Sequence, residues 1–360
     1  MTNVAILRDE TAAAAPSCQT TPSLSILIPV YNVAEYLEFC VQSILQQISN
    51  YNIEILLLDD CSTDGSRALC VRLCANHPEK LKLLCHDVNA GLSAARNSLL
   101  DAARGDYVWF LDSDDYLMPG CIKELHLIFD THGPDMVLCD YQKRRFIKKK
   151  SFPGRGRKLE SDNAKLVSGV FQHRKMYSWA RISKRSLWGS DLRFPAGRTF
   201  EDIATTPWLL LRAKSYYYVP QSWVFYRTRD QSIMTSFSRT KGHFDALKHD
   251  DMASAMLGFK PLLIEKIGPH TQGPSYYASH FLAKEYTKLA ARFCSARNNP
   301  LASCGLKPAT LYPYFEKMQQ CSPYDYNMLS RAYLKRLRIF SFLAFRKAAL
   351  LATKGRSNAG

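Results

Sequence analysis

Short apolar runs alternate with stretches that have a helical spacing of apolar residues along residues 24–141. Leu24–Val30 and Ile53–Leu58 are predominantly apolar, which is typical of strands buried on both faces. The same pattern predicts further elements: strands over 81–85, 107–111 and 136–140, and helices over 34–47, 66–75 and 92–103. Strands and helices that alternate in this way predict an α/β fold with a doubly wound, mostly parallel sheet flanked by helices.

The rest of the chain divides into regions of different character. Residues 1–22 combine charged residues with a run of small residues and are predicted to be a flexible tail. Residues 23–240 are predicted to form one α/β domain, whose halves at 23–141 and 159–240 are joined by a basic, glycine-containing stretch. Residues 241–360 are predicted to be a helical C-terminal region.

Acidic residues stand where two of the predicted strands end. Asp59 and Asp60 follow one strand, and Asp112, Asp114 and Asp115 follow another. Ligands of doubly wound sheets bind beyond the carboxyl ends of the strands, so the fold would bring both groups to one rim. Carboxylates this close repel one another, and a cation would neutralise them; oxygen ligands without nearby His or Cys suit Mg²⁺ or Mn²⁺. The sequence therefore predicts a metal site at Asp112, Asp114 and Asp115, here named the acid cluster. A polar loop that caps the next helix is the alternative.

The charge balance favours an anionic partner. The 360 residues include 48 Lys and Arg against 32 Asp and Glu, a formal net charge of +16. Nucleic acid, anionic lipid and a phosphorylated substrate would all suit this charge. The sequence has no nucleic-acid recognition motif, which argues against a nucleic-acid-binding protein. It has no GxGxxG after the first strand, which argues against a Rossmann dehydrogenase, and it has no P-loop. The 11 scattered cysteines lack zinc-finger and redox spacings and indicate reduced thiols in a cytoplasmic protein.

A basic amphipathic helix is predicted over residues 329–352. The segment contains no acidic residue and mixes Lys and Arg with Leu and Phe. Such a helix suits the interface of an anionic membrane, which predicts a protein held peripherally on the inner face of the cell membrane. The alternative is a helix that docks on the protein core with a basic outer face.

Four segments of the chain form an ordered set. They are SILIPVYN at 25–32, EILLLDDCSTDGS at 54–66, NAGLSAARN at 89–97 and GDYVWFLDSDD at 105–115. This set resembles the family 2 glycosyltransferases, which have the GT-A fold of nucleotide-diphosphate-sugar transferases. The resemblance extends to about residue 235 through Trp179, Glu201-Asp202, Tyr226-Arg227 and SIMT at 232–235.

For the donor, the resemblance implies a nucleotide pocket. Asp60 would accept a hydrogen bond from the base, as an acidic residue does in uridine-binding members, which favours UDP. Asp112 and Ser113 would lie near the ribose and the metal, and Asp114 would ligate the metal directly, with Asp115 beside it. The other implied donor residues are Pro29, Tyr31 and Asn32 along the pocket, Asn89 and Arg96 on its diphosphate side, and Arg227 on the diphosphate.

For catalysis, the resemblance implies that Asp202 is the general base. Inverting transfer needs a carboxylate that takes the proton of the acceptor hydroxyl as it attacks the anomeric carbon. Glu201 is the alternative base, and both residues could instead be a helix-start pair favoured by the helix dipole. Trp179 would be a wall of the acceptor site or an aromatic residue of the core.

The implied reaction is an inverting, metal-dependent transfer of one sugar from a nucleotide-diphosphate sugar to a hydroxyl of a lipid-linked or surface-polysaccharide acceptor. The Gln-x-x-Arg-Trp motif of processive synthases is absent, which favours single-sugar transfer. Two alternatives stay open. A nucleotidyltransferase normally needs a Gly-rich phosphate loop with Lys or Arg, which residues 29–32 lack. A nucleic-acid-binding protein is the second, prompted by the net charge.

Overall fold

Two compact units make up the chain. The computed structural model describes residues 4–6, 21–144, 147–228, 245–268, 272–297 and 307–357. The first unit comprises residues 1–162, 177–197 and 212–227, and the second comprises residues 163–176, 198–211 and 228–360. The second unit thus takes three segments, 163–176, 198–211 and 228–240, from within the predicted α/β domain, whose boundaries stay a prediction. Of the predicted flexible tail, residues 1–3 and 7–20 lie outside the described residues, as does SIMT at 232–235.

The first unit is built on one mixed sheet. Its strands are β1 (Val4–Ile6), β2 (Leu24–Val30), β3 (Ile53–Asp59), β4 (Leu81–His86), β5 (Tyr107–Phe110), β6 (Tyr116–Leu117), β7 (Met136–Arg144), β8 (Ile147–Lys149), β9 (Leu159–Glu160), β10 (Arg181–Lys184) and β11 (Tyr216–Phe225). Its helices are α1 (Ala34–Leu45), α2 (Ser66–Asn76), α3 (Leu92–Ala102) and α4 (Cys121–His132), with short 3-10 turns η1 (Ser178–Ala180) and η2 (Arg185–Leu187).

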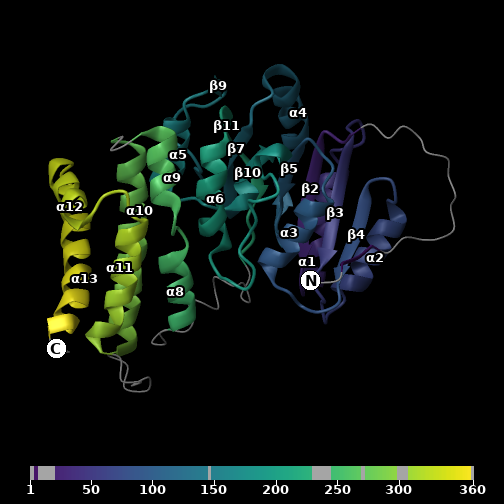
Figure 1. The fold of residues 1–360 in the computed structure, drawn as a ribbon. Helices are drawn as coiled ribbons and strands as arrows, with labels where there is room; N and C mark the ends of the chain where they lie inside the picture. The colour runs from purple at the N-terminus through teal and green to yellow at the C-terminus, as the bar shows by residue number, and fades with distance from the viewer. Residues whose placement is uncertain are drawn as a thin grey trace. The chain divides into compact units, whose positions relative to one another are not determined.

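The strand order is β1-β4-β3-β2-β5-β10-β7-β11-β6, with β8 on β7 and β9 on β11 (Figure 1). β4, β3, β2 and β5 are parallel, and so are β7 and β11, whereas β10 lies antiparallel between β5 and β7. This confirms the predicted doubly wound, mostly parallel sheet. β11 is one strand with an irregular register between Val219 and Val224.

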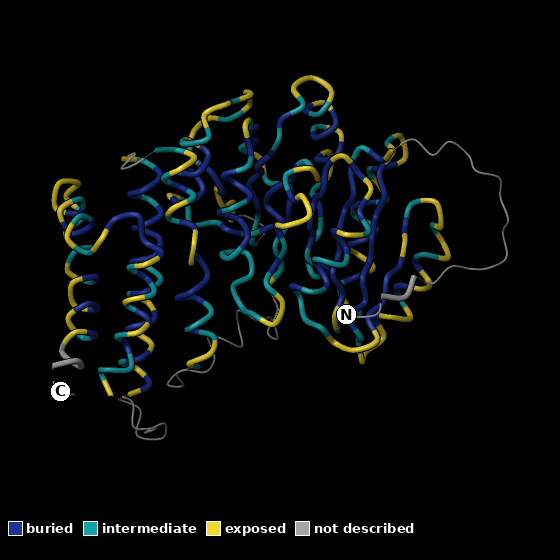
Figure 2. Tube along the Cα trace, in the orientation of Figure 1, coloured by how far each residue is buried: buried dark blue, intermediate teal, exposed yellow. Residues whose placement is uncertain are grey.

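The register of the central strands positions the site. Val30 of β2 lies beside Asp59 of β3, and Leu27 of β2 lies beside Phe110 of β5. Every residue of β2, β3 and β5 is buried, as expected for parallel strands covered on both faces, and these central strands are dark blue in Figure 2. Because these strands are parallel, the acidic residues that follow β3 and β5 lie at the same edge of the sheet.

Gly105 fits a close backbone approach just before β5. A Cβ atom at this position would lie 2.5 Å from the Ser25 backbone nitrogen. The Gly105 N–H donates to Ser25 Oγ at 2.8 Å, and Ser25 in turn donates to the buried Glu54 carboxylate at 2.6 Å. The glycine therefore allows β5 to enter the sheet directly beside β2 and in register with it.

The second unit consists of helices. They are α5 (Asn163–His173), α6 (Glu201–Arg212), α8 (Ala246–Ser254), α9 (Phe259–Ile267), α10 (Pro274–Arg297), η4 (Pro308–Leu311), α11 (Tyr312–Cys321), α12 (Tyr326–Lys335) and α13 (Ile339–Ser357). α10, α11 and α13 pack on one another (Figure 1). The ring of Phe171 on α5 is buried, and its centroid lies 5.6 Å from that of Phe281 on α10 and 5.7 Å from that of Phe259 on α9. These contacts hold the three helices together. No helix in the described part of the chain has the length and apolar character that crossing a bilayer requires.

The prediction of a single helix over residues 329–352 is wrong, because α12 ends at Lys335 and α13 begins at Ile339. Leu337 has a φ of 54°, in the left-handed region. The Arg338 N–H donates to the Tyr333 carbonyl, and the Leu337 N–H donates to the Leu334 carbonyl. These two bonds form a Schellman motif, which is usually built on Gly. The sequence gives no Gly or Pro signal for this break.

Leu337→Gly should stabilise the protein. An L-residue in the left-handed region costs about 1–2 kcal/mol, and the Leu337 side chain is 84% exposed, so little packing is lost. After the entropy cost of Gly in the unfolded chain, we expect the free energy of unfolding to rise by about 0.5–1 kcal/mol in urea denaturation. Leu334→Gly, inside α12, is the control and should lower it by about 1 kcal/mol. Equal losses for both variants would contradict the strain at Leu337.

Candidate functional site

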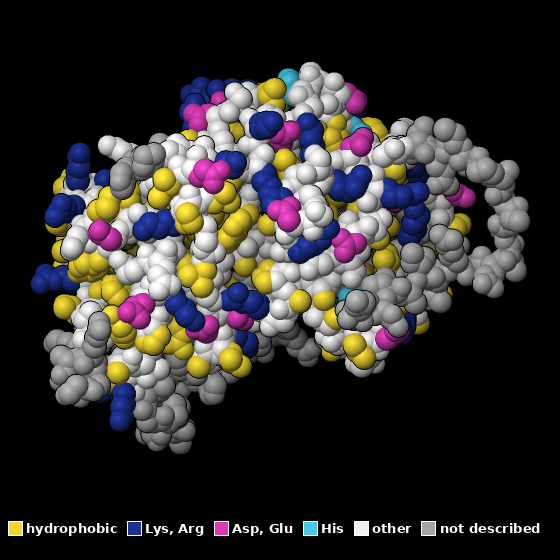
Figure 3. Space-filling view, viewed as in Figure 1, with side chains coloured by type: hydrophobic (Ala, Val, Ile, Leu, Met, Phe, Trp, Pro, Cys, Tyr) yellow, Lys and Arg dark blue, Asp and Glu magenta, His cyan; other side chains and the backbone are white. Residues whose placement is uncertain are grey.

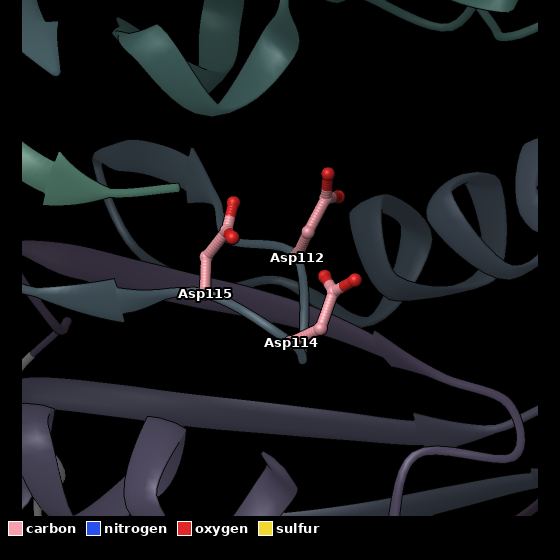
Figure 4. Close-up of side chains that lie close together, drawn as sticks. All are labelled: Asp112, Asp114 and Asp115. Carbon is pink, nitrogen blue, oxygen red and sulfur yellow. The ribbon is translucent and has the colours of Figure 1, made fainter. Parts of the chain in front are cut away.

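The acid cluster lies in the turn that follows β5. The Asp115 N–H donates to the Asp112 carbonyl at 3.0 Å, which closes the turn. Oxygen atoms from Asp112, Asp114 and Asp115 lie within 4.8 Å of one another, and the three side chains point to the same side of the loop (Figure 4). Asp115 is buried, Asp112 and Asp114 are half-buried, and Ser113 between them is buried. The structure thus brings together the three predicted metal ligands.

Asp115 has the least favourable electrostatic surroundings of the three carboxylates in the acid cluster. Its Oδ1 accepts the Arg227 backbone N–H at 2.8 Å, whereas its buried Oδ2 has no partner among the described residues. Burial raises the pKa of Asp115 well above its ordinary value, and the carboxylates of Asp112 and Asp114 raise it further. An ionised Asp115 therefore needs a positive charge that the described side chains do not supply at Oδ2.

A divalent cation fits this site. The three carboxylates supply hard oxygen ligands, and Asp115 Oδ2 receives no donor from the described residues. Asp112 and Asp114 are half-buried, so the site is partly open to solvent on their side. Mg²⁺ and Mn²⁺ prefer such ligands and keep some positions for water or substrate phosphates. The residues present are therefore suited to a metal that also contacts an anionic ligand.

Two arginines border the acid cluster. Arg96 is buried on α3, and its Nη2 donates to Asp112 Oδ1 at 3.0 Å while its guanidinium faces the Phe194 ring at 5.3 Å. This ion pair orients Asp112 and leaves Asp115 uncompensated. Arg227 is held from the other direction, through its backbone bond to Asp115. The sequence prediction placed both arginines on the diphosphate side, and the structure places both beside the acids.

An aromatic group positions the Arg227 side chain. Its guanidinium carbon lies 5.7, 4.7 and 5.0 Å from the ring centroids of Tyr36, Phe39 and Tyr116. Tyr116 stacks on Phe225 at 4.7 Å, so the group is itself packed on β11. Cation–π contacts of this kind restrict a long side chain without neutralising its charge. The sequence analysis missed these aromatic residues, because they come from α1, β6 and β11 and share no motif.

Asp60 joins the ends of β3 and β4 to the start of α3. Its Oδ1 accepts from His86 Nδ1 at 2.7 Å and from the Ala90 N–H at 2.9 Å, and its Oδ2 accepts from the Gly91 N–H at 2.8 Å. His86 Nε2 lies 3.0 Å from Ser98 Oγ, which fixes the ring. A carboxylate has about four acceptor positions, and donors from the described residues fill three of them at Asp60.

His86 is a site residue that the sequence prediction passed over. It is fully buried, and its contact with Asp60 sets the orientation of that carboxylate. Its position at the end of β4, where ligands bind in this fold, was the available signal.

The other predicted pocket residues lie at the ends of β2 and β4. Pro29 is buried within β2, Tyr31 is 45% exposed, and Asn89 is exposed. Asn32 has a φ of 50°, and its Oδ1 accepts the Thr63 N–H at 2.8 Å. The Asn32 side chain therefore ties the loop after β2 to the loop after β3. The Tyr31 side chain is exposed at the same end of β2.

The predicted base and acceptor residues come from α6 and η1. Glu201 and Asp202 occupy the first turn of α6, in the second unit, and both are half-buried. Trp179, in η1 of the first unit, is 2% exposed and stacks on Tyr177 at 4.8 Å and on Tyr226 at 5.9 Å. The described packing of Trp179 is that of a core aromatic residue. The catalytic and acceptor roles of these three residues stay predictions.

Removal of metal should expose the repulsion within the acid cluster. In EDTA, we expect Asp115→Asn to raise the free energy of unfolding at pH 7 by on the order of 1 kcal/mol, because it removes a buried charge without a full set of partners. Folding raises the pKa of Asp115, so above about pH 4 this residue holds more proton in the folded than in the unfolded protein, and its contribution to stability should fall as the pH rises. The variant should lack this contribution. Mn²⁺ should stabilise the wild type more than the variant in thermal unfolding. Equal responses to Mn²⁺ would argue against Asp115 as a ligand.

Comparison with known proteins bears on this site. Residues 25–184 match the family model of Glycosyl transferase family 2. EpsH of Bacillus subtilis (strain 168), which is named as a glycosyltransferase, is 29% identical over 234 residues, 61% of this chain and 64% of that protein. TuaG of the same organism, named as a teichuronic acid biosynthesis glycosyltransferase, is 40% identical over 94 residues, 26% of this chain and 36% of that protein. The matched part of the chain thus spans less than two thirds of the length of both relatives.

A solved structure shares the fold. Residues 1–349 of S. aureus TarS, in complex with UDP-GlcNAc, align with a TM-score of 0.63 and 18% identity, covering 93% of this chain and 92% of that chain. At this identity the likeness concerns the fold, and it includes the helical C-terminal region as well as the sheet.

Proposed function

Because this chain belongs to glycosyl transferase family 2 and has the GT-A fold, we propose that it transfers one sugar from a nucleotide-diphosphate sugar, with UDP as the nucleotide, to a hydroxyl of a lipid-linked or surface-polysaccharide acceptor. The reaction is metal-dependent and inverts the anomeric centre. The observation that carries the proposal is the acid cluster, whose three carboxylates converge inside the segment that matches the family model.

The donor pocket of this proposal lies along the ends of β2, β3, β4 and β5. Asp60 would accept a hydrogen bond from the base, and the exposed Tyr31, which follows the Val30 whose carbonyl accepts the Asp60 N–H, would stack on it. Asp112, Asp114 and Asp115 would hold a divalent cation, which would stabilise the charge that develops on the departing diphosphate. Arg227, fixed by its aromatic group, would contact the diphosphate. The UDP-sugar bound by the TarS fragment agrees with this choice of nucleotide.

The acceptor side of the proposal rests on α6. The Asp202 carboxylate takes the proton of the acceptor hydroxyl, and the hydroxyl oxygen forms the new bond to the anomeric carbon as the bond to the diphosphate breaks. Nucleoside diphosphate leaves, and the proton remains on Asp202 until solvent removes it. Glu201, the neighbouring acid in the same helical turn, is the alternative base.

Calorimetric titration with UDP, GDP and dTDP, each with and without Mn²⁺, tests the donor site. We expect UDP to bind, with an affinity that Mn²⁺ increases and that the other nucleotides do not reach. A folded protein that binds none of them would contradict the proposal. Release of pyrophosphate instead of nucleoside diphosphate from a bound donor would favour a nucleotidyltransferase, and a complex with DNA or RNA at physiological salt would favour a nucleic-acid-binding protein.

The C-terminal helices suggest where the protein works. Residues 326–357 contain no acidic residue, and Figure 3 shows hydrophobic and Lys or Arg side chains next to one another over α12 and α13. Leu337 and Phe340 are 84% and 90% exposed, and Leu343 and Leu350 flank Arg346 and Lys347 on α13. We propose that this surface binds an anionic membrane, which would bring the enzyme to a lipid-linked acceptor.

Co-sedimentation with vesicles tests this attachment. We expect binding to phosphatidylglycerol vesicles, little binding to phosphatidylcholine vesicles, and a loss of binding in Phe340→Ser. Leu247→Ser replaces an apolar residue on α8 that is 81% exposed and should bind like the wild type. If both variants bound equally well, the surface of α12 and α13 would not be the contact.

A further inference from the structure

The second unit carries a group of cations that the proposed sugar transfer does not use. Arg174 follows α5, Lys284 and Lys288 lie on α10, and Arg336 and Arg338 lie between α12 and α13. These five residues are named the basic cluster. They come from three segments that are far apart in sequence, so the packing of the helices of this unit brings them together.

One stripe of α10 forms the floor of the basic cluster. Tyr276, His280 and Lys284 follow one another at four-residue spacing, which places them on one helix face. His280 is buried, and its Nε2 lies 2.9 Å from Arg338 Nη1, which can only donate. The imidazole is therefore neutral, with its proton on Nδ1, and donates to Tyr333 Oη at 2.9 Å. The lowered pKa of His280, about 3, agrees with this; burial is the main cause, followed by the charges of Arg338, Lys284 and Arg174.

Donors exceed acceptors around this stripe. The Tyr276 ring is 1% exposed, and its hydroxyl has no hydrogen-bond partner among the described residues. The Tyr333 oxygen accepts from His280, so the Tyr333 hydroxyl proton is left to donate. Arg174 Nε is likewise buried without a partner in the described part of the chain. Buried polar groups are normally paired, so an excess of donors points to an acceptor that binds from outside.

Positive charge also exceeds negative charge. Glu285 pairs with Arg174, and its carboxylate accepts from Lys288 Nζ at 2.9 Å. Within the described ranges, Lys284, Arg336 and Arg338 have no carboxylate at ion-pair distance. Burial lowers the pKa of Lys284, and the nearby charges of Arg174, Arg338 and Lys288 lower it further. The unliganded cluster is therefore under like-charge repulsion, which an anion would relieve.

The cluster is accessible through Arg336. This side chain is exposed and lies over the Tyr276 ring, with its guanidinium carbon 4.0 Å from the ring centroid. The Schellman turn at Leu337 sets Arg336 and Arg338 on either side of one left-handed residue, so both guanidinium groups face Tyr276. We infer that the basic cluster is a binding site for a phosphate group, either of a soluble phosphate compound or of a lipid headgroup. Several Arg and Lys donors along one face of α10 match the charge and the acceptor oxygens of phosphate.

Pyrophosphate in EDTA tests the site, with the ionic strength matched by NaCl. Thermal unfolding should show that low millimolar pyrophosphate stabilises the wild type, and that Lys284→Gln and Arg336→Gln bind it about tenfold more weakly. Lys266→Gln removes an exposed cation of α9, outside the cluster, and should respond like the wild type. Any pyrophosphate bound at the donor site is common to all four proteins, so the difference between variants reports the basic cluster.

A second readout separates a ligand site from a structural role. Without pyrophosphate, Lys284→Gln should be more stable than the wild type, because one repelling charge is gone. Lower stability of this variant, or an unchanged pyrophosphate response in both cluster variants, would overturn the inference. UDP and Mn²⁺ binding should stay unchanged in these variants, so failure here is distinguishable from failure of the proposed donor site.

Vesicles distinguish the two sources of phosphate. If the headgroup is the ligand, phosphatidic acid vesicles should bind the wild type more tightly than phosphatidylglycerol vesicles of equal charge density, and Lys284→Gln should lose this preference. If a soluble phosphate compound is the ligand, both vesicles should bind alike while the pyrophosphate difference persists. If the variants kept both the lipid preference and the pyrophosphate response of the wild type, a phosphate site at the basic cluster would be refuted.

Discussion

We expect Asp114→Asn to slow sugar transfer by about 10³-fold, which corresponds to about 4 kcal/mol of activation free energy. The change keeps the size of the side chain and removes one of three converging carboxylates. Without this ligand, the cation that balances the departing diphosphate would be held more weakly and in another position. The rate is measured as transfer of labelled sugar from the UDP-sugar to a lipid extract, and Mn²⁺ binding is measured by calorimetry on the same protein.

The control for this change is Asp130→Asn, an exposed acid on α4 that lies outside the acid cluster. It should transfer sugar at the wild-type rate and bind Mn²⁺ normally. An Asp114→Asn protein that is folded, has lost Mn²⁺ affinity and still transfers sugar would show that the reaction does not need the metal. Full activity with unchanged Mn²⁺ affinity would instead remove Asp114 from the site.

Asp202→Asn should reduce the turnover number by about 10²- to 10⁴-fold and leave UDP binding unchanged. The base acts on the acceptor hydroxyl, so its loss affects the chemical step and not the binding of the donor. Asp202 and Glu201 share the first turn of α6, where the helix dipole favours both acids, so a purely structural role would affect both variants through stability. Turnover and thermal stability should therefore be measured together.

Glu201→Gln is the matched comparison for the base. If Asp202 is the base, Glu201→Gln should keep most of its activity. A large loss in Glu201→Gln with an active Asp202→Asn would transfer the assignment to Glu201. If both variants lost turnover only because they lost thermal stability, Glu201 and Asp202 would have a structural role at the start of α6 and not a catalytic one.

Features that depend on local pattern were predictable from the sequence. The alternation of strands and helices was predicted because burial on both faces of a parallel strand leaves a run of apolar residues. The positions of Asp59-Asp60 and the acid cluster at one rim followed from the parallel order alone, since parallel strands end at the same edge. The break between α12 and α13 was not predictable, because Leu337 adopts the left-handed region without the Gly that usually signals it.

The sequence by itself determined the α/β class, the family resemblance and the three converging carboxylates, all of which are written in contiguous residues. Only the tertiary structure decided the surroundings of the site residues: His86 on Asp60, the aromatic rings around Arg227, and the lack of a partner for Asp115 Oδ2 among the described residues. It also decided that β10 enters the sheet antiparallel and that the basic cluster forms at all. These features join residues separated by tens to more than a hundred positions, and the packing of whole elements, which no local periodicity encodes, selects such contacts.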